Sequence, residues 1–185
     1  MAPTGRDYSQ SFQGNASGCR RRVARWHQAA GMVLWPTPYN GNAVILFHGV
    51  GDNRQGMGAY AELLLANGYA VLLPDSRAQG ASGGAFATYG IKEADDTGRW
   101  FDWLADADHS RCVFGMGESM GAAILLQALR VEPRFCAAVA ESSFANFREI
   151  EYVRVGQFLR VGPWLGRIVL RPVVELAFLQ SGSRT

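Results

Sequence analysis

Short apolar runs alternate with segments of helix length from residue 43 onward. The runs cover residues 43–47 (AVILF), 69–73 (YAVLL), 111–115 (RCVFG) and 135–140 (FCAAVA). Almost continuously apolar runs are typical of strands that are covered on both faces. Their alternation with helices is typical of a parallel sheet whose strands are joined by crossover helices. The sequence therefore predicts an α/β fold.

Three helices are expected between these runs. Residues 58–67 end at Gly68, a residue type that commonly caps a helix C-terminus. Residues 91–105 place Trp100, Trp103 and Leu104 on one side of a helix, and residues 119–131 form a helix that stops before Pro133. A further strand is expected at residues 32–35, ahead of the turn PYNGN.

The composition, with 48% hydrophobic and 18% charged residues, is that of one globular domain. We expect a flexible leader over residues 1–30, whose first 20 residues are rich in Gly, Ser, Gln and Asn. Residues 31–141 would form the α/β core. Residues 142–185 carry aromatic and Arg-rich amphipathic stretches, and they are expected to form a helical cap or crossover segment broken at Gly162 and Pro163.

The formal net charge of +2 gives no reason to expect a nucleic-acid partner. The basic run at residues 20–25 (RRRVAR) is interpreted as a solvated surface, with a nucleic-acid patch or a targeting signal as the alternative. No apolar run reaches 18 residues, so no membrane span is predicted.

The three cysteines, Cys19, Cys112 and Cys136, have no metal-ligand spacing, and we expect neither a metal site nor a cofactor. Cys112 and Cys136 lie in apolar runs, which favours buried free thiols and a reducing compartment. No signal-like apolar stretch precedes them. The sequence therefore predicts a cytoplasmic location.

Residues 117–121 (GESMG) match the pattern G-x-S-x-G, which places a serine on a sharp turn between a strand and a helix. So short a pattern also arises by chance, and its context decides. An apolar run precedes it and a helix-forming stretch follows it. Gly117 and Gly121 would let the strand and the helix approach closely. We therefore expect Ser119 to be a nucleophile, with a plain tight turn as the alternative.

A serine nucleophile also needs donors for the negative oxygen of its tetrahedral intermediate. The loop His48-Gly49-Val50-Gly51 follows the first apolar run, so it is expected at the same rim of the sheet as Ser119. The backbone N–H groups of Val50 and Met120 could then converge on one point. His48 is expected to hold this loop through hydrogen bonds; general base is the alternative.

Four strings occur in a consistent order: FHGVGDNR, LLPDSRAQGASGG, GESMGAAILLQ and AESSF. In these strings the chain resembles the α/β-hydrolase superfamily, and more narrowly the small serine hydrolases related to the S33 and S9 peptidases and the BEM46-like proteins. The resemblance implies a mostly parallel sheet flanked by helices. It also implies that Ser119 is the nucleophile, that Met120 and Val50 are the oxyanion donors, and that Asp75 and Arg77 form a structural turn.

In that family the catalytic acid and the histidine follow the nucleophile, after strands that this sequence lacks. The histidines of this chain, His27, His48 and His109, all precede Ser119, and a makeshift triad of Ser119, His48 and Glu141 is expected to be unsuitable. The polar end at residues 180–185 is interpreted as a truncated or frameshifted reading frame. An exposed sheet edge would then favour self-association.

Two functions follow from this pattern, with a weaker third, a binding module that uses the loop at residues 48–51 without chemistry. The first is a serine hydrolase that acts on esters, or on peptide or acyl substrates, through an acyl-serine, with weak or no activity in this chain. The second is a non-catalytic fragment or subunit completed by another polypeptide. The substrate-binding residues are unknown, and the aromatic residues of the cap line either a pocket or the packing beneath it: Phe144, Phe147, Tyr152, Phe158 and Trp164.

Overall fold

The computed structural model describes residues 20–26 and 28–146, together with positions 150, 168, 171, 172 and 176. The chain divides into two compact units, residues 1–143 and 144–185. The elements of the first unit are, in chain order, β1 (Arg20–Trp26), β2 (Ala29–Trp35), β3 (Asn42–Phe47), the 3-10 helix η2 (Arg54–Met57), α1 (Gly58–Ala66), β4 (Ala70–Pro74), α2 (Glu93–Asp108), β5 (Cys112–Glu118), α3 (Met120–Ala128) and β6 (Ala137–Glu141).

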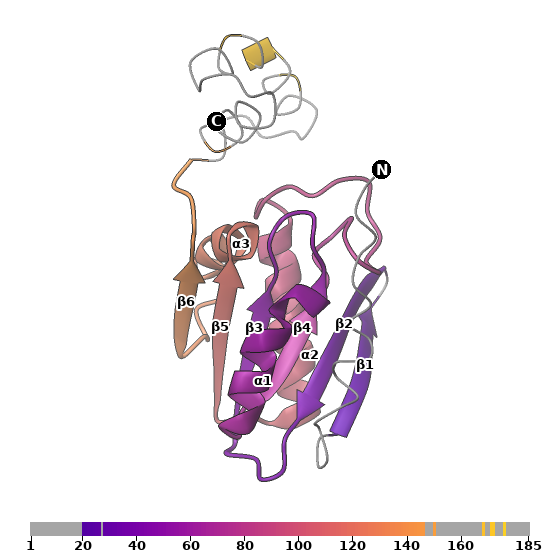
Figure 1. Ribbon diagram of the computed structural model, residues 1–185, viewed down its shortest axis with the longest axis vertical. Coiled ribbons are helices and arrows are strands. Elements are labelled where there is room, and N and C mark those ends of the chain that lie inside the picture. Colours follow the sequence, from indigo (N-terminus) through magenta and orange to yellow (C-terminus); the bar gives the residue numbers. More distant parts are fainter. Residues whose placement is uncertain are drawn as a thin grey trace. The chain divides into compact units, whose positions relative to one another are not determined.

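Within the described residues, the strands form one six-stranded sheet in the order β1-β2-β4-β3-β5-β6 (Figure 1). Strand β2 is antiparallel to both of its neighbours, whereas β4, β3, β5 and β6 run parallel. The chain leaves β3 toward β4 and leaves β5 toward β6, on opposite sides. The carboxyl ends of β3 and β5 therefore form a topological switch point, the place where α/β sheets usually bind ligands.

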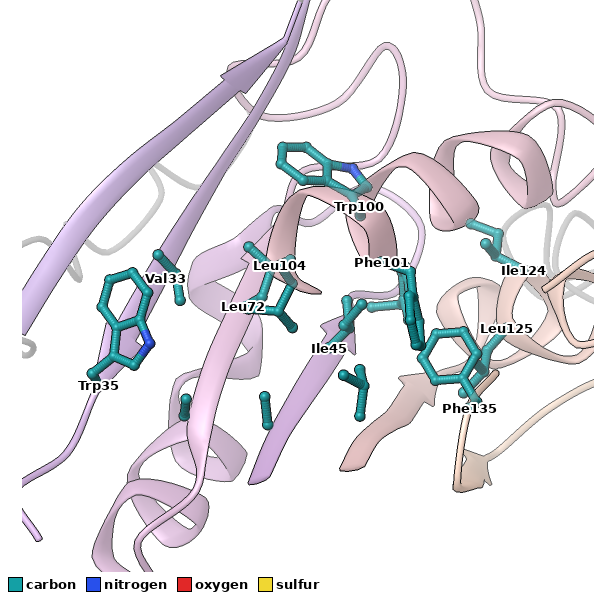
Figure 2. Packing of buried hydrophobic residues seen from close by; sticks show 14 of the residues in the cluster. Val33, Trp35, Ile45, Leu72, Trp100, Phe101, Leu104, Ile124, Leu125 and Phe135 are labelled. Atoms are coloured by element: carbon teal, nitrogen blue, oxygen red, sulfur yellow. The ribbon is translucent and has the colours of Figure 1, made fainter. Parts of the chain in front are cut away.

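Two hydrophobic clusters, one on each face of the sheet, hold the helices against the strands. On the first face, Trp100, Phe101 and Leu104 of α2 and Ile124 and Leu125 of α3 pack on the strands (Figure 2). The second cluster joins alternate strand residues to Met57 and Ala61, at the end of η2 and in α1. Because side chains alternate along a strand, strands covered on both faces must be apolar throughout.

The predicted α/β fold is confirmed, with element boundaries displaced by a few residues. The runs predicted as strands at residues 43–47, 69–73, 111–115 and 135–140 lie in β3, β4, β5 and β6 or directly beside them. The three predicted helices correspond to α1, α2 and α3. The two helices expected after residue 141 fall almost entirely outside the described residues.

The leader expected over residues 1–30 contains ordered structure at its end. Residues 20–26 form β1, which pairs along its whole length with β2, and β2 begins at Ala29. The Arg-rich run therefore belongs to a strand at the edge of the sheet that the described residues form. The Arg22 guanidinium lies 5.5 Å from the ring centroid of Trp103.

Two further expectations are corrected. Strand β6 was expected to be covered on both faces, but it lies at the edge of the sheet in the described part of the chain, and Val139 is 56% exposed. Cys112 and Cys136 were expected to be free thiols, but they form a disulfide with a Cα–Cα distance of 5.8 Å. The expected cytoplasmic location thereby loses one of its supports, because disulfides are rare in reducing compartments.

Among the described residues, no helix has the length and apolar character needed to cross a membrane.

Candidate active site

Ser119 lies in the turn between β5 and α3, with φ of 52° and ψ of −111°. A positive φ is unusual for a residue other than glycine and costs about 1–3 kcal/mol, which the surrounding structure must supply. Such strained residues cluster at functional sites. The turn opens at the carboxyl end of β5, beside the end of β3, and thus at the switch point of the sheet.

Both glycines of the G-x-S-x-G pattern are required by close backbone contacts. A β-carbon at Gly117 would lie 2.4 Å from the carbonyl carbon and oxygen of Gly121. A β-carbon at Gly121 would lie 2.1 Å from the carbonyl oxygen of Phe47, the last residue of β3. The glycines therefore let α3 begin directly against the ends of β5 and β3.

The loop after β3 lies against the Ser119 turn. A β-carbon built at Gly49 would stand 3.8 Å from the β-carbon of Ser119 and 3.8 Å from the carbonyl oxygen of Glu118. Gly51 has a φ of +73°, which favours glycine at this bend of the loop. The structure thus brings together the two segments that carry Val50 and Met120.

His48 is fully buried, and both of its ring nitrogens are engaged within the chain. The backbone N–H of Ser76 donates to Nε2 at 3.0 Å, so Nδ1 carries the proton and donates to the carbonyl oxygen of Gly49 at 2.8 Å. Burial is the main cause of a lowered pKa for His48. A neutral imidazole with these bonds ties the loop after β3 to the loop after β4.

Asp75 anchors the loop after β4 from a buried position. Its Oδ1 accepts the backbone N–H of Arg54 at 2.8 Å, and its Oδ2 accepts that of Ala81 at 2.7 Å. The Arg54 guanidinium completes an ion pair with it at 3.1 Å. Arg77 of the same loop makes a two-point contact with Asp96 of α2. Both Asp75 and Arg77 therefore brace the turn that the resemblance implied.

Strand β6 also reaches the Ser119 turn, which the sequence did not predict. The backbone N–H of Ser119 donates to the carbonyl oxygen of Glu141 at 2.9 Å. The Glu141 carboxylate accepts a hydrogen bond from the hydroxyl of Tyr60 in α1, and this bond raises the pKa of Tyr60 to about 12. No sequence pattern predicts the bond between Ser119 and Glu141, because both its donor and its acceptor are backbone groups.

Neither described histidine is placed to act as a general base for Ser119. His48 uses both ring nitrogens in the contacts above, and Glu141 bonds to Tyr60, so the makeshift triad does not form. His109 caps the C-terminus of α2 before β5, whose seven residues separate it from Ser119 by about 20 Å. His27 lies outside the described residues.

A cavity of about 470 Å³ lies between the loop after β4 and α2, with walls that include Arg77, Asp96 and Trp100. Ser119 is not among its lining residues. The described residues contain no group of three or more His, Cys, Asp or Glu side chains that could hold a metal ion.

The fold and the strand–turn–helix geometry at Ser119 define an α/β hydrolase. The family model described as "Serine aminopeptidase, S33" matches residues 40–181, and the chain belongs to this family.

Three relatives show how far the similarity extends. The uncharacterized protein YqkD of Bacillus subtilis is 33% identical over 126 residues, which are 66% of this chain and 41% of YqkD. The structure of the esterase Pf2001 from Pyrococcus furiosus matches with a TM-score of 0.69 and 27% identity, over 83% of this chain and 64% of the esterase. XC6422 of Xanthomonas campestris, a serine hydrolase without a lid, shares the fold with a TM-score of 0.55 and 20% identity, over 64% of this chain and 58% of XC6422. The chain thus spans less than two thirds of each of these relatives.

Proposed function

We propose that this chain is a serine hydrolase in which the Ser119 Oγ attacks the carbonyl carbon of a carboxylic ester. The attack forms an acyl-serine and releases the alcohol, and water then releases the acid and restores Ser119. The observation that carries the proposal is the positive φ of Ser119 at the switch point, where two glycines allow close approach of the backbone.

The backbone N–H groups of Val50 and Met120 are proposed as the oxyanion hole. Met120 is the first residue of α3, where backbone N–H groups have no partner within the helix. Val50 lies in the loop whose Gly49 adjoins the Ser119 β-carbon. Loss of one such donor typically costs on the order of 3 kcal/mol of transition-state stabilisation. His48, Gly49, Gly117 and Gly121 would support this arrangement.

An ester is the proposed substrate class, and a peptide or another acyl compound is the alternative. The esterase Pf2001 supports the first, and the description of the family as serine aminopeptidases supports the second. The aromatic residues suggested as pocket lining lie in the second unit, and of these only Phe144 is among the described residues.

Turnover by this chain is proposed to be low. An intact triad contributes about 10⁶-fold, while an oxyanion hole and binding alone leave about 10³ to 10⁴-fold over water. Neither His48 nor His109 can take the proton of Ser119 in the described structure. This observation also favours the second candidate function, a non-catalytic chain or a subunit completed by another polypeptide that supplies an acid and a base.

Labelling with a fluorophosphonate probe tests the nucleophile. Because neither described histidine can take the proton of Ser119, we expect slow labelling that reaches one adduct per chain with excess probe, located on Ser119 by mass spectrometry and lost in Ser119→Ala. Ser110→Ala, which removes a hydroxyl before β5 at the other end of the strand, should label like the unmodified chain. Equal labelling of Ser119→Ala would refute the assignment.

Hydrolysis of a short p-nitrophenyl ester separates the two candidate functions. The rate is measured for the 185-residue chain alone and together with the C-terminal segment of a longer relative, such as YqkD. A large gain on addition of the segment supports the completed-subunit function. Appreciable turnover by the chain alone, without any gain, would exclude it.

The expected self-association and the cytoplasmic location remain proposals. In the described part of the chain, strand β6 has an exposed edge, so Val139→Lys should shift an oligomer toward monomer in analytical ultracentrifugation, whereas Leu63→Lys on α1 should not. If Val139→Lys has no effect, association does not use this edge.

A reducing cytoplasm would keep Cys112 and Cys136 as thiols, so alkylation of the pair in intact cells tests the location.

A further inference from the structure

Strand β6 is an exposed strand that holds the backbone of the proposed nucleophile. It pairs with β5 from Phe114↔Ala137 to Glu118↔Glu141, and in the described part of the chain it has no strand on its other side. Its last carbonyl, that of Glu141, accepts the N–H of Ser119 at 2.9 Å. The position of β6 therefore bears directly on the strained turn at Ser119.

Two side-chain interactions fasten β6, one near each end. At its C-terminal end, the Glu141 carboxylate accepts a hydrogen bond from the hydroxyl of Tyr60 in α1. At its N-terminal end, Cys136 directly precedes the strand and is bonded through its sulfur to Cys112, the first residue of β5. The Cys136 N–H also donates to the carbonyl oxygen of Val113 at 2.9 Å.

The disulfide encloses the catalytic turn within a short covalent loop. Cys112 and Cys136 are 24 residues apart, and the segment between them contains the rest of β5, Ser119 and the whole of α3. The bond holds the Cα atoms of Cys112 and Cys136 5.8 Å apart, so the start of β5 and the residue before β6 cannot separate while it is intact. The disulfide thus joins the two ends of the segment from Cys112 to Cys136, which contains Ser119.

We propose that the Cys112–Cys136 disulfide is a redox-sensitive cross-link that positions Ser119 through β6. In the oxidised chain β6 is held at both ends, and Glu141 keeps its bond to the Ser119 N–H. In the reduced chain the N-terminal end of β6 loosens and the Ser119 turn relaxes. The effect on β6 stands on the geometry alone, whereas an effect on reactivity rests on the proposed function of Ser119.

The chemical step is thiol–disulfide exchange with a small dithiol. A thiolate of the dithiol attacks one sulfur of the Cys112–Cys136 bond, and its second thiol then closes the reagent to a cyclic disulfide. The two electrons of the dithiol pass to the cysteine sulfurs, and its two protons end on the thiols of Cys112 and Cys136. Access is available, because Cys136 is exposed and Cys112 is half-buried.

Backbone dynamics in the folded state test the positioning effect independently of catalysis. In a Cys19→Ser background, ¹⁵N order parameters are measured for the oxidised chain and for the chain reduced with dithiothreitol. We expect the values at Ser119 and Val139 to fall from about 0.85 to below about 0.6, while Leu72 in the buried strand β4 stays near 0.85. Unchanged values at Ser119 and Val139, or an equal fall at Leu72, would overturn the proposal.

Variants separate the effect of the disulfide from that of the hydrogen bond between Tyr60 and Glu141. Cys112→Ala/Cys136→Ala should reproduce the order parameters of the reduced chain and should not respond to dithiothreitol. Tyr60→Phe, which removes the hydroxyl that bonds to Glu141, should add to the effect of reduction at Ser119. A response to dithiothreitol in the double variant, or no effect of Tyr60→Phe in the reduced chain, would contradict a strand held at both ends.

The labelling rate of Ser119 with a fluorophosphonate probe then distinguishes this inference from the proposed function. We expect labelling to slow by about tenfold on reduction, which corresponds to about 1.4 kcal/mol, and to recover on reoxidation with oxidised glutathione, whose disulfide takes up the two electrons and two protons. Labelling at equal rates in both redox states would overturn the control of reactivity. No labelling in either state, together with the expected fall in order parameters, would refute the nucleophile and leave the positioning of the turn supported.

Discussion

At Gly121, the position where a β-carbon would stand is already occupied by the backbone of β3. Gly121→Ala would place this atom 2.1 Å from the carbonyl oxygen of Phe47, so α3 or β3 must shift. We expect a loss of about 1–3 kcal/mol in the free energy of unfolding, as for other overpacked sites, and slower labelling of Ser119. Chemical denaturation and probe kinetics measure the two effects.

Gly98 provides the matched control for this substitution. It lies within α2, where a β-carbon would have an ordinary contact of 3.7 Å with Glu132 Oε2. Gly98→Ala should therefore stabilise the chain by up to about 1 kcal/mol, because alanine is the better helix former. Equal effects at the two positions would show that the contact at Gly121 does not require glycine.

His48 predicts a dependence of stability on pH. In the folded chain, burial lowers the pKa of His48 below its ordinary value of 6.5. As the pH falls, the unfolded chain therefore binds a proton on His48 before the folded chain does. The contribution of His48 to stability is thus complete above about pH 6.5 and declines below it, by at most about 1.4 kcal/mol per pH unit. Urea unfolding between pH 7 and pH 5 should show a flatter profile for His48→Gln than for the unmodified chain.

The control for that profile is His109→Asn, at the left-handed C-cap of α2, where asparagine is also tolerated. A slope lost with His109, or retained without His48, would assign the pH dependence to another group.

The sequence predicted the local contacts of the Ser119 turn but not its long-range contacts. Gly117 and Gly121 could be related to close backbone approach because their spacing around Ser119 is tied to one local turn. The bond from Ser119 to Glu141 joins two backbone groups, and any residue type can make it. Tyr60 approaches Glu141 only through the packing of α1 on the sheet, a contact across 81 residues that no local pattern encodes.

At the scale of elements, burial determined which strands could be predicted. β3 and β4 are buried on both faces, and their apolar runs were evident in the sequence. β1 is an edge strand among those that the structure describes, and it begins with three arginines, so its composition resembled that of a leader. The apolar composition of β6 predicted a strand correctly but also suggested burial on both faces, which the described residues do not provide.

The disulfide between the start of β5 and the residue before β6 predicts a measurable difference in stability. Cys112 and Cys136 are 24 residues apart, and closing a loop of this size raises the free energy of the unfolded chain by about 3.5 kcal/mol. In guanidinium unfolding, Cys112→Ala/Cys136→Ala should lose about this amount relative to the oxidised chain. Cys19→Ser should lose nothing, and a double variant as stable as the oxidised chain would contradict the cross-link.

At the scale of the whole molecule, the alternation of strands and helices predicted both the fold class and the rim on which the site lies. Parallel strands bring their carboxyl ends to one rim, and the sequence placed residues 48–51 and Ser119 after two such strands. The order of the strands, which makes β3 and β5 neighbours, depends on long-range pairing that no local sequence pattern encodes. The cavity beside α2 was not predicted either, because its walls come from separate segments.

We propose that this chain contributes the nucleophile and the oxyanion hole, whereas neither of the described histidines, His48 and His109, is placed to act as the general base. A role as nucleophile accounts for the positive φ of Ser119 and for the two glycines of its turn. A role in holding the loop after β3 accounts for the hydrogen bonds of His48.

The central claim, that Ser119 and the loop after β3 form one acyl-transfer site, is tested most directly by a crystal structure of the fluorophosphonate adduct. We predict a covalent bond from phosphorus to Ser119 Oγ. One phosphoryl oxygen should lie about 2.7–3.1 Å from the backbone nitrogens of both Val50 and Met120. An adduct on another residue, or a phosphoryl oxygen directed away from both nitrogens, would contradict the claim.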